Sequence, residues 1–226
     1  MKLLLTSAGI GNAALRETLD DLLGKPVEEA TALVVPTSLH ALGRHENAWR
    51  DIAGVDTAPL VGIGWTSVGV LELAALPLLD RERWEPAVRT ADALLVCGGD
   101  PLFLHHWMRE SGLAEIVPTL DDTVYVGLSA GSMVLTPRIG DDFVGWCPPG
   151  TDADTPDIDR TLGIVDFSLF PHLGNPMLPD NNLATAQQWA AGLGNPSYAI
   201  ADGRAIRWVD GDVAVVGEGE VHEFPA

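Results

Sequence analysis

The chain has 226 residues, and its 32 acidic residues outnumber its 13 basic residues, which gives a formal net charge of −19. This charge excludes nucleic-acid binding and anionic-membrane binding as main functions, because both need a basic surface. The length and the 46% hydrophobic content favour one domain over residues 1–226, with a core that needs neither a disulfide nor a metal.

The first apolar run turns polar at Thr6, so it is typical of a strand and is too short for a signal peptide. No run approaches the roughly 18 apolar residues of a membrane span. The two cysteines, Cys97 and Cys147, do not indicate a disulfide framework. We therefore expect a cytoplasmic protein.

Short apolar runs alternate with helical patterns, which predicts an α/β fold with a doubly wound, mostly parallel sheet and helices on both faces. The expected strands are Lys2–Ser7, Ala32–Pro36, Val68–Leu73, Ala93–Cys97, Val124–Leu128, Ile164–Phe170 and Tyr198–Ala201. The expected helices are Ala13–Leu23, Leu39–Ile52, Glu82–Ala91, Leu102–Ser111, Leu113–Leu120, Ser129–Leu135 and Leu183–Ala191. Residues 137–161 are expected to form a long loop, and residues 205–224 antiparallel β-hairpins.

A G-x-S-x-G motif follows the expected strand Val124–Leu128 directly, as Gly127-Leu-Ser129-Ala-Gly131. A strand, this motif and a helical pattern together indicate a nucleophile elbow, a sharp turn that lifts a serine hydroxyl above the sheet. The helix N-terminus behind the serine offers N–H groups to a developing oxyanion. A helix-capping serine in an ordinary tight turn is the alternative for the motif alone.

A pair of glycines ends the neighbouring apolar run, in Gly98-Gly99-Asp100-Pro101. Glycines at the carboxyl end of a strand let backbone N–H groups approach a ligand, and ligands of open α/β sheets bind at this edge. We expect the N–H groups of Gly99 and Ala130 to form a two-donor oxyanion hole. Gly98 and Asp100, together with Asp141 in the long loop, are then candidates for substrate binding.

A serine nucleophile needs a base, and the base needs an orienting acid. His172 is the best candidate for the base, because it follows the expected strand Ile164–Phe170 at its carboxyl end. Asp166 lies too far back on that strand to orient the ring, at roughly 20 Å. The acid stays open among the aspartates of the long loop, which are Asp141, Asp142, Asp152, Asp154, Asp157 and Asp159. These aspartates lack the glycine and the final Glu of a calcium loop, so we expect no metal.

Three elements together resemble peptidase family S51: Gly98-Gly99-Asp100, Gly127-Leu-Ser129-Ala-Gly131 and Asp166-Phe-x-x-Phe-Pro-His172. The resemblance covers nearly the whole chain, and members of this family include dipeptidase E and cyanophycinase. It implies a class I glutamine-amidotransferase-like fold and a serine peptidase without a cofactor. Carried over, Ser129 is the nucleophile and His172 the base.

The same resemblance implies further roles. It places the acid in Gly140-Asp141-Asp142, with Asp142 as the choice and Asp141 in reserve, and the oxyanion donors at Gly99 and Ala130. Dipeptidase E uses an Arg after the histidine to bind an N-terminal Asp, and the matching segment Thr185–Trp189 contains none. Together with the acidic loop, this predicts a preference for neutral or cationic peptides.

The leading hypothesis is therefore a dipeptidase-E-like serine exopeptidase that hydrolyses short peptides by acyl transfer. A catalytically silent amidotransferase-like binding domain, and a cyanophycinase-like or other amidase, stay open as alternatives. The sequence leaves the oligomeric state open, a homodimer included.

Overall fold

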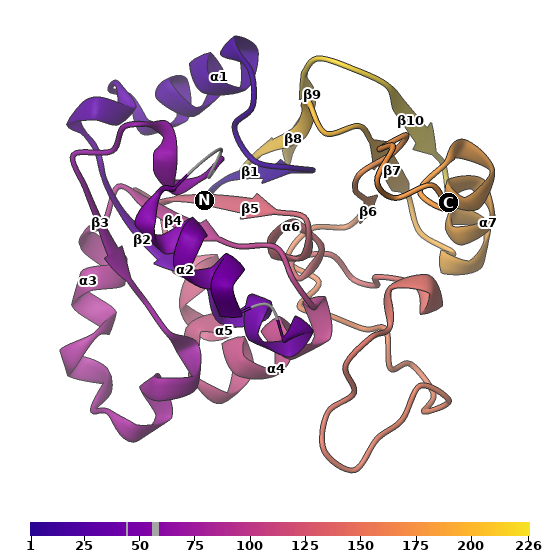
Figure 1. Cartoon of the computed structure of the whole chain (residues 1–226), viewed down its shortest axis with the longest axis horizontal. Helices are drawn as coiled ribbons and strands as arrows, with labels where there is room; N and C mark the ends of the chain where they lie inside the picture. Colours follow the sequence, from indigo (N-terminus) through magenta and orange to yellow (C-terminus); the bar gives the residue numbers. More distant parts are fainter. Residues whose placement is uncertain (44, 56–58) are drawn as a thin grey trace.

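The computed structural model describes residues 1–43, 45–55 and 59–226 of the chain. Its main element is a seven-stranded sheet with the strand order β3-β2-β4-β5-β1-β8-β9 (Figure 1). The first five of these strands are parallel, and β8 and β9 add an antiparallel hairpin at the edge of β1. The strands of this sheet are β1 (Lys2–Thr6), β2 (Thr31–Val35), β3 (Ser67–Val70), β4 (Ala93–Val96), β5 (Val124–Leu128), β8 (Arg204–Val209) and β9 (Asp212–Gly217).

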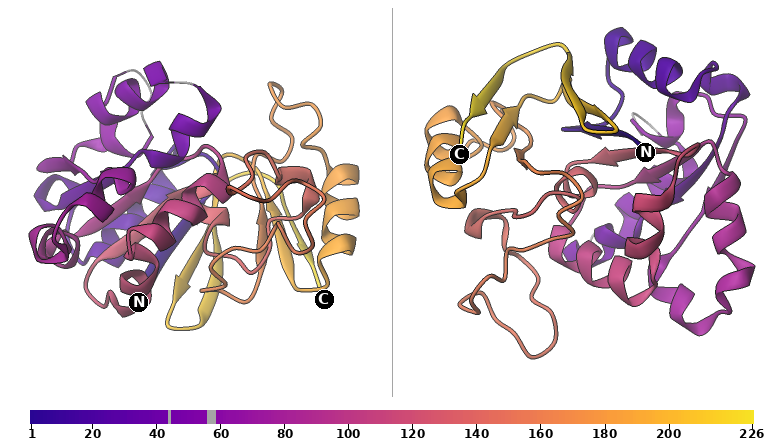
Figure 2. Two further views of the ribbon diagram at one scale, coloured as in Figure 1. Left: turned by 90° about the horizontal axis from the view of Figure 1, so that it is seen from below. Right: turned by 180° about the vertical axis from the view of Figure 1, so that it is seen from behind.

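Alternating side chains of the strands belong to two buried clusters, one on each face of the sheet. On one face, Leu4 and Val126 pack with α1 (Ala13–Leu23). On the other face, Leu94 and Tyr125 pack with α3 (Glu85–Thr90), α4 (Pro101–Glu110) and α5 (Leu113–Ile116). The helices therefore cover both faces, as the alternating sequence pattern predicts (Figures 1 and 2).

The α1 helix has the boundaries that its sequence predicts. The side chain of Asn12 accepts a hydrogen bond from Leu15 N–H at the start, and Gly24 ends the helix in the left-handed conformation with φ of 71°. The expected helix Leu39–Ile52 is divided instead into a 3₁₀ segment, Thr37–Leu42, and α2 (His45–Ala53), and its Arg44 lies outside the described residues.

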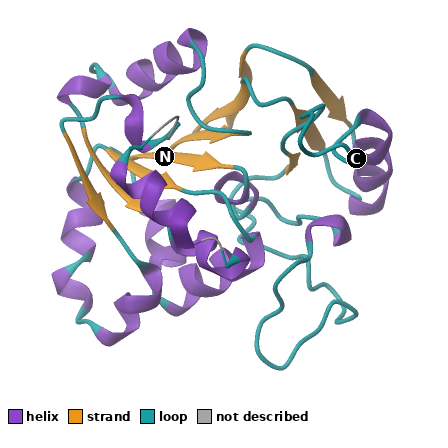
Figure 3. Ribbon diagram, in the orientation of Figure 1, coloured by secondary structure: helices purple, strands orange, loops and turns teal. Residues whose placement is uncertain are grey.

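A second, three-stranded sheet in the order β10-β7-β6 stands beside the main sheet (Figure 3). It contains β6 (Ser168–Phe170), β7 (Ser197–Ile200) and β10 (Val221–Phe224), and α7 (Leu183–Leu193) packs against it. The expected strand Ile164–Phe170 is thus shorter and belongs to this separate sheet. The reason is that Ile164 and Val165 donate their N–H groups to Leu135 O, at 2.8 and 3.1 Å, in the loop that follows the short helix α6 (Ala130–Met133).

The expected C-terminal hairpins are half confirmed. β8 and β9 pair through the Asp210–Gly211 turn, in which both residues have positive φ. β10 does not continue this hairpin but pairs antiparallel with β7 in the second sheet. Residues 144–160 form the long loop that the sequence predicts, and it extends away from both sheets (Figures 1 and 3). None of the described helices is long and apolar enough to cross a membrane.

Candidate active site

Ser129 occupies a strained turn between β5 and α6. Its φ of 49° and ψ of −110° are unusual for a residue with a side chain, and its carbonyl accepts the N–H groups of Ser132 and Met133. The flanking glycines are required for steric reasons. A Cβ atom on Gly131 would lie 2.2 Å from Val96 O, and one on Gly127 would lie 2.6 Å from Gly131 O. This is the geometry of a nucleophile elbow.

The paired glycines form a second turn beside Ser129. A Cβ atom on Gly98 would lie 3.4 Å from Ser129 Cβ, because β4 and β5 are neighbours in the sheet. Gly99 has φ of 138°, and its Cα packs so closely on Ser38 that a Cβ atom would lie 2.4 Å from Ser38 O. The buried Ser38 hydroxyl donates to the carbonyls of Cys97 and Gly98 and so holds this turn in place.

Gly99 and Ala130 have N–H groups that are free to act as donors. Among the described residues, neither N–H makes a hydrogen bond to the chain. An oxyanion hole requires backbone N–H groups without a partner in the chain, and the oxyanion role of these two N–H groups stays a prediction.

His172 lies just beyond β6 and has φ of 60°. Its Nδ1 forms a 2.6 Å hydrogen bond with Asp202 Oδ1, and its side chain is 19% exposed. Asp202 follows β7 in the segment that crosses from the second sheet to β8 of the main sheet. A carboxylate accepts at Nδ1, so the hydrogen bond favours the tautomer with its proton on Nδ1 and leaves Nε2 as the nitrogen on which a general base would accept a proton.

The family model of peptidase family S51 matches residues 3–216. The chain belongs to peptidase family S51. The chain is 24% identical to peptidase E of Nostoc sp. over 98% of the chain and 87% of that relative. It is 31% identical to peptidase E of Shewanella putrefaciens over 61% of the chain, and that alignment spans 59% of the relative's length.

Solved structures share the fold of this chain. One from Listeria monocytogenes EGD-e, named for peptidase E, has a TM-score of 0.69 at 20% identity and covers 96% of the chain and 98% of its own. A peptidase from an acI-B1 actinobacterium has a TM-score of 0.59 at 20% identity, over 100% of the chain and 94% of its own. These likenesses establish the class I glutamine-amidotransferase-like fold.

In the structure, Asp202 and not Asp142 bonds to His172 Nδ1. Asp141 and Asp142 begin the 3₁₀ turn Asp141–Phe143, are exposed, and line a hollow against α7 with Trp189. The turn faces α7 because Trp189 Nε1 donates to Ile139 O at 2.6 Å. Asp202 was missed because it lies outside the segment that the family resemblance indicated. Its position directly after the short strand β7 is the sequence signal that could have found it.

Asp100 has its carboxylate fully engaged by the chain. Its Oδ1 accepts the N–H groups of Leu102 and Phe103 at the start of α4, and its Oδ2 accepts Trp146 N–H at 2.7 Å. The residue is 5% exposed. It caps a helix and fastens the long loop, while the predicted substrate contacts of Gly98, Asp100 and Asp141 stay predictions.

The base of the long loop is closed by an ion pair. Arg138 Nε and Nη2 lie 2.8 and 2.7 Å from the carboxylate of Asp159, which is 1% exposed and also accepts Gly140 N–H. The hydrogen bonds and charge of Asp159 raise the pKa of Arg138. Two of the loop's acidic charges, Asp157 and Asp159, are therefore paired with arginines.

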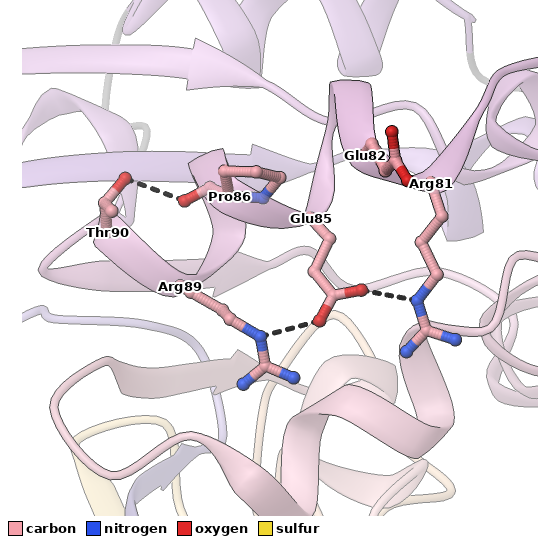
Figure 4. A pocket seen from close by; sticks show the side chains of 6 residues that line it. All are labelled: Arg81, Glu82, Glu85, Pro86, Arg89 and Thr90. Atoms are coloured by element: carbon pink, nitrogen blue, oxygen red, sulfur yellow. Dashed lines mark hydrogen bonds and ion pairs between the residues drawn. The ribbon is translucent and has the colours of Figure 1, made fainter.

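A separate hollow of about 630 Å³ lies against α3, lined by Arg81, Glu82, Glu85, Pro86, Arg89 and Thr90. Figure 4 shows Glu85 between Arg81 and Arg89, each of which donates to its carboxylate. The hollow contains no nucleophile with a base, so we assign no catalytic role to it. No group of three or more potential ligands within the described chain could hold a metal ion.

Proposed function

We propose that this S51 peptidase is a serine exopeptidase that hydrolyses short peptides through Ser129, His172 and Asp202. The observation that carries the proposal is the 2.6 Å hydrogen bond between His172 Nδ1 and Asp202. The end of β1 connects this pair to the serine turn, because Ser7 Oγ accepts His172 N–H and Thr6 O accepts Ser129 N–H. A strained serine, a base with a free nitrogen and an orienting carboxylate are the parts that acyl transfer needs.

In the proposed reaction, Ser129 Oγ attacks the peptide carbonyl while His172 Nε2 takes the hydroxyl proton. The N–H groups of Gly99 and Ala130 donate to the oxyanion, and His172 then protonates the leaving amine. Water releases the acyl group in the second half of the reaction, with His172 again as base. Asp202 keeps its negative charge throughout and stabilises the imidazolium form of His172.

The expected substrate class follows from the segment that the resemblance matches to the substrate-binding Arg of dipeptidase E. This segment, Thr185–Trp189, contains no Arg, and Arg138, which lines a hollow with Gln188 and Trp189 of α7, is engaged by Asp159. A substrate carboxylate buried without a cationic partner is costly. We therefore expect dipeptides with a neutral or cationic N-terminal side chain to be hydrolysed faster than those with Asp.

The test compares wild type with Ser129→Ala on a panel of dipeptides that differ in the N-terminal residue, together with labelling by a serine-directed phosphonate. The proposal expects hydrolysis and labelling in the wild type and neither in Ser129→Ala, at an unchanged melting temperature. Labelling that survives the substitution refutes it. If neither protein hydrolyses a peptide and a small molecule raises the melting temperature, the chain is a binding domain.

A further inference from the structure

Asp202 is the member of the proposed triad with the least protection from solvent. Its side chain is 39% exposed, about twice the 19% of His172. An exposed carboxylate can rotate and exchange its partners with water, so burial does not fix its orientation toward His172. Hydrogen bonds from neighbouring groups must supply that orientation.

Asn175 donates the first of these hydrogen bonds. Its Nδ2 lies 2.6 Å from Asp202 Oδ2, the oxygen that His172 does not use. Its Oδ1 accepts Met177 N–H at 2.8 Å. One end of the amide faces a carboxylate and the other a main-chain donor, so only one orientation of the amide satisfies both.

Ser7 supplies the second hydrogen bond. Its hydroxyl donates to Asp202 Oδ1 at 3.1 Å and accepts the main-chain N–H of His172 at 2.7 Å. Ser7 is fully buried directly after β1, and its own N–H donates to Arg204 O. Ser7 therefore connects His172 and Asp202 to the carboxyl end of β1 in the main sheet.

We propose that Asn175 and Ser7 are positioning residues that hold the Asp202 carboxylate in the orientation in which it accepts His172 Nδ1–H. This inference rests on the proposed function. Three donors together fix the orientation of the Asp202 carboxylate. His172 and Ser7 meet Oδ1, and Asn175 meets Oδ2, so rotation of the carboxylate breaks all three hydrogen bonds together.

The test is a double-mutant cycle between Asn175→Ala and Asp202→Ala, measured as kcat and KM on the best dipeptide and as the rate of phosphonate labelling. Asn175→Ala is expected to lower kcat and labelling about tenfold with KM within about twofold, the lower end for a hydrogen bond to a charged group because Asp202 is partly exposed. In the Asp202→Ala background, the same substitution is expected to have less than about a twofold effect.

Three further variants complete the test. Asn181 is the matched control, because its side chain bonds to Pro171 O in the same loop without touching Asp202, so Asn181→Ala should change kcat less than about twofold. Ser7→Ala should lower kcat about fivefold. Asn175→Asp keeps the size of the side chain but sets a second negative charge against Asp202, so it should lose at least as much as Asn175→Ala.

The outcomes separate this inference from the proposed function. Wild-type labelling at Ser129 together with an Asn175→Ala variant that reacts at the wild-type rate overturns the inference alone. Equal losses from Asn175→Ala in both backgrounds also overturn it, because they indicate a general loosening of the loop. A wild type that neither hydrolyses peptides nor is labelled at Ser129 overturns the proposed function, and the inference with it.

Discussion

Asp100 is expected to stabilise the protein through two separable sets of hydrogen bonds. Oδ1 caps α4 at Leu102 and Phe103, with distances of 3.0 and 2.8 Å, and Oδ2 holds Trp146 N–H at 2.7 Å. Loss of a helix cap costs about 1 kcal/mol, and loss of a buried hydrogen bond to a charged group costs about 2 kcal/mol. Asp100→Ala should therefore lower the free energy of unfolding by about 3 kcal/mol.

The Asp100→Asn variant separates the contribution of the helix cap from that of the hydrogen bond to Trp146 N–H. The amide oxygen stays at the helix N-terminus, where it faces two donors, and the amide nitrogen is then turned toward Trp146 N–H. The cap is kept and the loop hydrogen bond is lost, so we expect a loss of about 2 kcal/mol. In both variants, residues 144–160 should become more mobile to a similar extent, because the loop loses the same hydrogen bond to residue 100 in each.

Urea unfolding followed by far-UV circular dichroism measures the two losses, provided that the slope with urea is unchanged. In thermal scans, a loss of about 3 kcal/mol should lower Tm by about 6–12 °C for a chain of this size. Limited proteolysis should cut the loop faster in both variants than in the wild type. A loss below about 0.5 kcal/mol in Asp100→Ala, or a larger loss in Asp100→Asn than in Asp100→Ala, would show that the two sets of bonds do not act as described.

Three other predictions follow from the site and the core. Asp202→Ala should lower kcat/KM about 10³–10⁴-fold and Asp142→Ala less than about twofold; comparable losses would refute the assignment of the acid. Gly131→Ala should lower the free energy of unfolding by about 3 kcal/mol, because its Cβ would lie 2.2 Å from a carbonyl of β4. Gly192→Ala, whose Cβ would have nothing within 4 Å, should raise it by about 0.5–1 kcal/mol. Urea unfolding measures both changes. Burial lowers the pKa of His105 from 6.5 to about 4, so the unfolded chain binds a proton that the folded chain does not, and stability should fall as the pH falls from 6.5 toward 4. In His105→Leu, the free energies of unfolding measured in urea at pH 4.5 and pH 7.5 should differ less than in the wild type. An unchanged difference would show that His105 does not cause the pH dependence.

Local sequence signals predicted the parts of the fold that depend on local physics. Asn12 and Gly24 bound α1 because a capping side chain and a left-handed residue act within one helical turn. The spacing of the two glycines around Ser129 likewise predicted the strained turn, because a Cβ atom on Gly127 would meet Gly131 O, four residues later in the chain. The contact of Gly131 with Val96 O on β4 is non-local. The parallel order of strands followed from the alternation of strand and helix patterns.

Non-local pairing could not be predicted in the same way. A three-residue strand such as β6 carries no pattern that shows which sheet it joins, and here it pairs with β7 rather than with β5. That pairing brings Asp202 to His172, 30 residues apart in the chain. The family resemblance pointed to Asp142 in Gly140-Asp141-Asp142 instead. Only the pairing of the second sheet distinguishes the two carboxylates.

Because the chain is synthesised from its N-terminus, the hydrogen bond between Ser7 and Asp202 can form only late in synthesis. The two residues are 195 positions apart, so the carboxylate can reach the carboxyl end of β1 only after residue 202 has left the ribosome. A nascent chain that already contains the Ser129 turn thus lacks the proposed acid for some seconds at ordinary translation rates. Under the proposed function, the triad is completed after the parallel strands β1 to β5 have been synthesised, at about the time that β8 and β9 join the same sheet.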